Sequence, residues 1–106
     1  MIDEVLHALV EPRRRKLLEL VNDHELTSGE LASHFPDVTR PAISQHLKVL
    51  EDAGLVLVRR EGTRRLYRAR PDNLEELREY LEIFWENRLQ RLKEAVETET
   101  RSKKDE

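Results

Sequence analysis

The stretch TRPAISQHLKVLEDAGLVLVRREGTRRLYR, residues 39–68, decides the fold. Apolar side chains recur at helical spacing in its first half, whereas its second half alternates with the period of two that is typical of strands. The halves meet at Gly54, and a glycine at that place favours the end of a helix. The sequence therefore predicts a helix over residues 39–53, with Thr39 as its N-cap, followed directly by a β-hairpin.

The predicted helix has two different faces. At about 100° per residue, Ile43, Leu47 and Leu50 fall within about 60° of one another and form an inward, apolar face. Polar side chains on the opposite face have the chemistry to contact base edges or phosphates in the major groove of DNA. These polar residues are Ser44, Gln45 and Lys48. His46 lies at the margin of the apolar face, so a packed structural histidine and a base contact both remain open.

The predicted hairpin joins strands over residues 55–60 and 64–69 through Glu61-Gly62-Thr63, where the glycine is available for positive φ. Its tip carries four arginines, Arg59, Arg60, Arg64 and Arg65. Because side chains on a strand alternate between faces, we expect about two of the four to reach one DNA strand. Contacts of this kind with phosphates or the minor groove make binding strongly dependent on salt.

The residues before this stretch predict three more helices. Apolar spacing favours one over residues 2–10, and Pro12 opens a second that runs to about residue 22. Thr27 followed by Glu30 reads as a capping box at the start of a short third helix, which ends at Pro36. Two short helices, a tight turn, a longer helix and a basic hairpin form the order of a winged helix-turn-helix.

A long amphipathic helix is predicted from Pro71 to about Val96. It measures roughly 39 Å at 1.5 Å per residue, which is longer than a winged-helix body needs. The free energy gained by burying its large apolar side chains exceeds the ~5 to 15 kcal/mol of a typical domain's stability. Leaving half of these side chains exposed is therefore implausible. We therefore expect a homodimer, the alternative being a stripe that packs only on its own domain. The predicted interface residues are Leu74, Leu77, Leu81, Phe84, Trp85, Leu89, Leu92 and Val96, with Ile2, Val5 and Leu9 of the first helix.

The complete predicted architecture is mainly α with a small β-hairpin, in the order α-α-α-α-β-β-α. A chain of 106 residues has room for one domain, predicted over residues 1–97, of which 71–97 are the dimerisation helix. Residues 98–106 contain no apolar side chain and are predicted to be a disordered tail. No apolar run is long enough for a membrane span and no basic n-region of a signal peptide is present, so we expect a cytoplasmic protein.

Positive charge is concentrated in the middle of the chain. The whole sequence has 19 basic and 22 acidic residues, but residues 40–70 hold eight basic and three acidic ones. A basic segment between two acidic ones is typical of a domain with one surface for a polyanion, which predicts double-stranded DNA as the partner. The alternative is a protein-interaction adaptor on a winged-helix scaffold, for which these cations are only a solvated face. No motif of an enzyme is present, neither a Gly-rich phosphate loop nor G-x-S-x-G.

EPRRRKLLELV (residues 11–21), ELTSGELASHF (25–35) and the 39–68 stretch together resemble the ArsR family of bacterial winged-helix repressors. The resemblance covers Ile2 to about Leu92. It implies a homodimer on a partly palindromic operator, in control of its own or a neighbouring operon. It also implies DNA contacts from Ser44, Gln45 and His46. The predicted DNA-binding residues are Thr27, Ser28, Thr39, Arg40, Ser44, Gln45, His46, Lys48, Arg60, Arg64 and Arg65.

The metal sites of the family are missing from this sequence. Founding members carry ELCVCDL where this chain has ELTSGEL, and the chain contains no cysteine at all. Other members bind zinc between the C-terminal helices through Asp and His pairs, whereas no histidine follows His46 here. The chain therefore resembles the metal-independent branch, without a metal or cofactor and with an unknown inducer. The alternative is a ligand- or metal-sensing repressor with a non-standard site.

Overall fold

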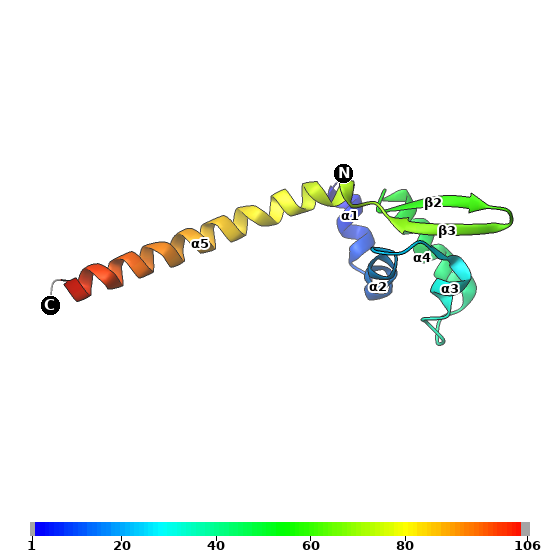
Figure 1. Cartoon of the computed structure of the whole chain (residues 1–106), viewed down its shortest axis with the longest axis horizontal. Helices are drawn as coiled ribbons and strands as arrows, with labels where there is room; N and C mark the ends of the chain where they lie inside the picture. The colour runs from blue at the N-terminus through cyan, green and yellow to red at the C-terminus, as the bar shows by residue number, and fades with distance from the viewer. Residues whose placement is uncertain (1, 105–106) are drawn as a thin grey trace.

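The computed structural model describes the backbone of residues 2–104 and the side chains of residues 2–100. The elements are α1 (Ile2–Leu9), α2 (Pro12–Leu20), β1 (Leu26–Thr27), α3 (Ser28–Ala32), α4 (Arg40–Asp52), β2 (Val56–Glu61), β3 (Arg64–Ala69), a 3-10 turn η1 (Pro71–Leu74) and α5 (Glu75–Lys104). Figure 1 shows α1 to β3 gathered into one body, from which α5 projects as a long rod. The predicted winged helix-turn-helix, mainly α with a small antiparallel sheet, is confirmed.

The core lies where the four short helices meet the sheet. Its largest fully buried side chains are Leu17, Leu31, Ile43, Leu47, Leu50, Leu55, Val5 and Val21. Burial of each such side chain is worth about 1.5 to 3 kcal/mol. The set contains all three residues of the predicted inward face of α4, so the opposite face of that helix is turned outward.

Two threonines set the places where α3 and α4 begin. Thr27 Oγ1 accepts a hydrogen bond from the Glu30 amide, and the Glu30 carboxylate accepts one from the Thr27 amide, both at 3.1 Å. This confirms the predicted capping box. Thr39 Oγ1 accepts from the Ala42 amide at 3.3 Å, as expected of the N-cap of α4. The two caps thus define where each helix of the motif begins.

The sheet has three antiparallel strands in the order β1-β3-β2. The sequence did not predict β1, because two residues are too few to display a period; it pairs Leu26 with Tyr67 and Thr27 with Leu66. The hairpin connection is one residue shorter than predicted, because Glu61 pairs with Arg64. The turn is therefore Gly62-Thr63, with Gly62 at φ +63°, a value that favours glycine.

The C-terminal helix differs from its prediction at both ends. Pro71 opens a 3-10 turn, and the α-helix proper runs from Glu75 to Lys104. The predicted disordered tail from residue 98 is wrong as far as residue 104, and residues 105–106 lie outside the described residues. An α-helix satisfies its backbone groups within itself, so polar helix formers such as Glu and Lys extend it without an apolar stripe. No helix in the described range is long and apolar enough to cross a membrane.

Candidate nucleic-acid interface

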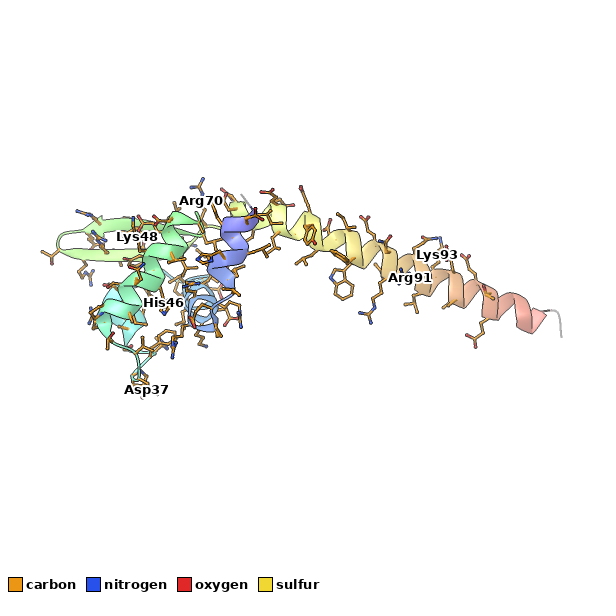
Figure 2. All side chains as sticks on the ribbon, turned by 180° about the vertical axis from the view of Figure 1, so that it is seen from behind. Asp37, His46, Lys48, Arg70, Arg91 and Lys93 are labelled. Carbon is orange, nitrogen blue, oxygen red and sulfur yellow. The ribbon has the colours of Figure 1, made fainter. Side chains whose placement is uncertain are left out.

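The exposed face of α4 presents polar side chains as predicted, but they differ in availability. The side chains of Ser44 and Gln45 are exposed and have no hydrogen-bond partner among the described side chains, residues 2–100, or the described backbone. Lys48 Nζ lies 3.1 Å from Asp52 Oδ1, and this hydrogen bond raises the pKa of Lys48. Figure 2 labels Lys48 and His46 on the same helix. Ser44 and Gln45 therefore keep their polar groups free on the exposed face of α4, whereas the charge of Lys48 is offset within the helix.

His46 is turned toward α2 rather than outward. Its Nδ1 lies 3.4 Å from an Arg14 guanidinium nitrogen, and its Nε2 lies 3.8 Å from Glu11 Oε2. The side chain is only 17% exposed. Both ring nitrogens thus face partners in the same chain, which favours the structural alternative over a direct base contact.

The wing, defined as the β2–β3 hairpin, sorts its four arginines into two pairs. Arg60 lies opposite Arg65 and Arg59 opposite Leu66, so Arg60 and Arg65 share one face of the hairpin. This face turns toward α4, because both side chains line a hollow of about 470 Å³ together with Lys48, Glu51 and Val58. Arg60 and Arg65 are therefore the two of the four arginines that share the face toward α4, and the expectation that about two of the four reach one DNA strand stays a prediction.

Arg59 belongs to the opposite face and its charge is already neutralised. It donates two hydrogen bonds to the carboxylate of Glu25, at 3.0 and 2.6 Å, and lies 3.1 Å from Glu61. The hydrogen bond from Arg59 lowers the pKa of Glu25, and the same pairing raises the pKa of Arg59. Arg64 also contacts Glu61, at 3.4 Å. Both arginines of this face are thus partly or wholly matched by carboxylates.

A second hollow, of about 380 Å³, separates the start of α3 and α4 from the tip of the wing. Three arginines line it, Arg40, Arg64 and Arg65, and no acidic side chain does. Ser28 and Thr63 add hydroxyls, which complete a lining suited to an anion. Thr27 also reaches this hollow, but its hydroxyl caps α3, as that of Thr39 caps α4. The hollow therefore brings five predicted DNA-binding residues together: Thr27, Ser28, Arg40, Arg64 and Arg65.

The residues predicted for a dimer interface divide into three groups. Val5 was wrongly included, because it is 1% exposed in the core of its own chain and has no surface left for a partner. Leu9, Leu74 and Leu77 are partly buried against that same core, and Ile2 is half-buried. Large apolar side chains with about half of their surface exposed follow along α5: Leu81, Phe84, Trp85, Leu89, Leu92 and Val96.

Exposed apolar residues that the sequence did not assign to the interface lie on α1, directly after it and on α5. On α1, Leu6 is 43% exposed beside the buried Val5, and Val10, directly after the helix, is 69% exposed. The helical period alone does not decide which of two adjacent apolar residues faces inward, and here Val5 is the one that enters the core. Tyr80 and Ile83 are also about half exposed, but at about 100° per residue they lie on the side of α5 opposite to Trp85, outside the stripe.

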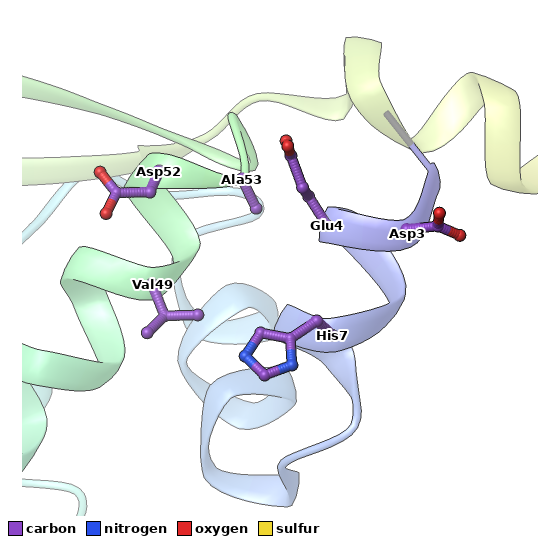
Figure 3. Close-up of a pocket in the computed structure, with 6 residues that line it drawn as sticks. All are labelled: Asp3, Glu4, His7, Val49, Asp52 and Ala53. Carbon is purple, nitrogen blue, oxygen red and sulfur yellow. The ribbon is translucent and has the colours of Figure 1, made fainter.

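A third hollow, of about 470 Å³, lies between α1 and the end of α4 (Figure 3). Three carboxylates, those of Asp3, Glu4 and Asp52, line it with His7, over an apolar floor of Val49 and Ala53. Such a lining repels phosphate, so this hollow is not part of the basic surface. Among the side chains that the structure describes, no three of the His, Asp and Glu residues are placed to hold a metal ion.

Known proteins resemble this chain in both sequence and fold. Residues 11–57 match the family model described as bacterial regulatory protein, arsR family. The chain is 42% identical over 97 residues to the HTH-type transcriptional regulator Rv2034 of Mycobacterium tuberculosis. The aligned residues cover 92% of this chain and 90% of that protein.

Solved structures give the same result. One described as "Possible transcriptional regulator for arsenical resistance" has a TM-score of 0.69 at 47% identity, over 82% of this chain and 90% of the other. Another, of Mb0332 from Mycobacterium bovis, is described as a homodimeric winged helix-turn-helix DNA-binding domain. It has a TM-score of 0.63 at 28% identity and covers 80% of this chain and 78% of its own.

Proposed function

The chain belongs to the ArsR family of bacterial regulatory proteins, and we propose that it is a homodimeric repressor that reads a double-stranded operator with α4 and the wing. The family and its named relatives are transcriptional regulators rather than enzymes. In our proposal the protein acts in the cytoplasm and controls its own or a neighbouring operon. Ser44 and Gln45 contact base edges, and the arginines around them bind the backbone.

One observation carries this proposal, namely the three cations left without a carboxylate around the exposed face of α4. Arg40, Arg60 and Arg65 form no salt bridge with any described residue, whereas Arg59 and Arg64 do. The three line two hollows that share Arg65 and adjoin α4 and the wing. A DNA duplex carries one phosphate charge per ~1.7 Å of axis and supplies the missing counter-charges.

The homodimer is supported by the apolar stripe of α5 and by the homodimeric relative from Mycobacterium bovis. Six predicted interface residues of α5 are about half exposed in the single chain, in a helix that projects from the body (Figure 1). A two-fold pair of reading helices spaced by about one turn of DNA, ~34 Å, contacts two half-sites on one face of the duplex.

The experiment that tests base reading is a selection from a library of random DNA duplexes with the purified protein. We expect enrichment of one partly palindromic sequence, called here the selected duplex. On it, the variants Ser44→Ala and Gln45→Ala lose about 10-fold in affinity, whereas on a shuffled duplex of the same composition they lose less than about 2-fold. Equal losses on both duplexes contradict base reading by α4, and failure to enrich any sequence contradicts an operator-binding repressor.

The backbone contacts are tested by the salt dependence of binding, with two arginines of the same wing as a matched pair. Removing a phosphate contact lowers the slope of log affinity against log salt by about 1, which we expect for Arg65→Ala. Arg59→Ala is the control, because its charge is matched by Glu25 and Glu61, and it leaves the slope unchanged. The reverse result contradicts the assignment. A protein-interaction adaptor, in contrast, tolerates both changes.

Metal independence is a further part of the proposal. It is supported by the absence of cysteine from the whole sequence and of any metal-binding group among the side chains described. Since one similar structure is described as a possible regulator for arsenical resistance, arsenite is the first compound to test. Gel shifts of the selected duplex are expected to be the same with and without arsenite, zinc or cadmium. Release of the duplex at stoichiometric metal contradicts this part and favours a sensor with a non-standard site.

A further inference from the structure

Arg14 is the only buried charged side chain in the part of the chain that the structure describes. It belongs to α2, is 9% exposed, and the hydrogen-bond partners of its guanidinium among the described residues lie in α1 and α4. A buried cation is costly unless its donors are satisfied, so its partners show which parts of the fold depend on it.

The guanidinium joins α1 to α4. Its Nε donates to the Ala8 carbonyl at 2.7 Å and one terminal nitrogen donates to the His7 carbonyl at 3.0 Å. These are two of the carbonyls that the end of α1 leaves without helical partners, where a positive charge is also favoured by the helix dipole. The other terminal nitrogen lies 3.4 Å from His46 Nδ1 in α4.

The bond to His46 depends on the tautomer of that ring. A guanidinium has donors only, so this contact is a hydrogen bond in the tautomer of His46 whose Nδ1 accepts. Nε2 faces Glu11, at 3.8 Å from its carboxylate. The ring is therefore held from two sides. His46 directly follows Gln45, so a turn of the ring and its backbone changes the placement of the proposed base-reading side chains.

We propose that Arg14 is a positioning residue for operator recognition, which links the end of α1 to the reading helix through His46. This inference rests on the proposed function, because it requires that α4 reads bases. It adds a link between two surfaces: α1 exposes Leu6 and contacts the proposed dimer helix α5, and in our proposal α4 faces the duplex. Arg14 itself contacts neither DNA nor a partner.

The neighbouring Arg15 provides a matched control. One of its terminal nitrogens donates to the carbonyls of Leu9 and Val10, at 2.7 and 3.2 Å. Arg15 therefore holds the same end of α1 with the same chemistry, but from an exposed position and without a hydrogen bond to α4 among the described residues. A purely structural role of Arg14 in closing the α1–α2 junction predicts equal losses of affinity on every duplex, whereas positioning through His46 predicts a loss confined to the sequence that α4 reads.

The test is a double-mutant cycle between Arg14 and His46, read as affinity for the selected duplex and for its shuffled control. We expect Arg14→Gln to weaken binding to the selected duplex about 10-fold and to the shuffled duplex less than about 2-fold. In the His46→Ala background, Arg14→Gln adds less than about 2-fold, because the group through which it acts is gone. Arg15→Gln changes neither affinity by more than about 2-fold.

Folding is followed on the same samples by thermal unfolding. If Arg14→Gln does not fold, the cycle is run with Arg14→Lys, which keeps the charge but cannot hold three acceptors in a fork. An equal loss on both duplexes, or the full loss of affinity persisting in the His46→Ala background, overturns the positioning role. If the wild-type protein itself does not discriminate the two duplexes, the proposed function fails instead, and the two failures are distinguishable.

Discussion

The body and the C-terminal helix of this protein differ in how much of their apolar surface the single chain buries. In the body, Leu17, Leu31 and Leu50 have no exposed surface, and their partners all come from the same chain. On α5, Trp85, Leu89 and Leu92 are 57 to 60% exposed along a rod that the body does not cover (Figure 1).

The two regions therefore depend on different equilibria, the body on folding of the single chain and α5 on association of two chains. Side chains buried within one chain stabilise it at any protein concentration, whereas a stripe covered by a second copy stabilises only the associated state. We therefore expect mutations in the body to change the free energy of unfolding and mutations on α5 to change self-association.

The largest effect is expected from a cavity in the body. Leu47 is 1% exposed at the centre of the inward face of α4, and Leu47→Ala is expected to cost about 2 to 5 kcal/mol of unfolding free energy. Leu57→Ala is the control, since Leu57 on β2 is 54% exposed, and costs within about 0.5 kcal/mol. Urea denaturation measures both. Similar costs for the two variants contradict the described core.

The next effect concerns α5 and appears in association. Leu92→Glu places a charge in the exposed stripe and is expected to weaken self-association about 100-fold, or about 2.7 kcal/mol, in sedimentation equilibrium. Asn87→Glu adds the same charge away from the stripe and is expected to leave association unchanged. A wild-type protein that sediments as a single chain at micromolar concentration contradicts the proposed dimer, and with it the contrast between the two regions.

A smaller effect is expected at the joint between the regions. Asn73 of η1 donates a hydrogen bond to the Ala53 carbonyl at the end of α4, at 3.1 Å, and so links the turn that precedes α5 to α4. Asn73→Ala is expected to cost about 1 kcal/mol of unfolding free energy in urea denaturation. An unchanged free energy of unfolding contradicts a stabilising role for this hydrogen bond between η1 and the end of α4.

The smallest effect is a pH dependence within the body. The amide and then the hydroxyl of Thr27 hold the pKa of the Glu30 carboxyl below its ordinary value of 4.5. A carboxyl with a lowered folded-state pKa stabilises the protein above the unfolded value, and this contribution is lost as pH falls through the folded value. The stability difference between wild type and Glu30→Gln is therefore larger near pH 7 than below pH 4.5. A difference that stays constant between urea titrations at pH 7 and pH 3.5 contradicts the described cap.

How much the sequence predicted depends on the range of the interactions involved. The inward face of α4 and both threonine caps follow from residues within two turns of one another, and they were predicted correctly. The pairing of Arg59 with Glu25 joins residues 34 positions apart, and neither the helical nor the strand period contains that information. The sequence accordingly predicted four arginines at the tip of the wing but not which of them are neutralised.

The order of the elements, the polar outer face of α4 and the apolar stripe of α5 follow from the amino-acid sequence, because each depends on the residue pattern of a continuous segment. Only in the folded chain does Val5 rather than Leu6 enter the core, do Arg40, Arg60 and Arg65 stay without a salt bridge to any described residue, and does Arg14 contact His46. These outcomes depend on which side chains from distant segments compete for the same space or charge, and that competition exists only when the chain is folded.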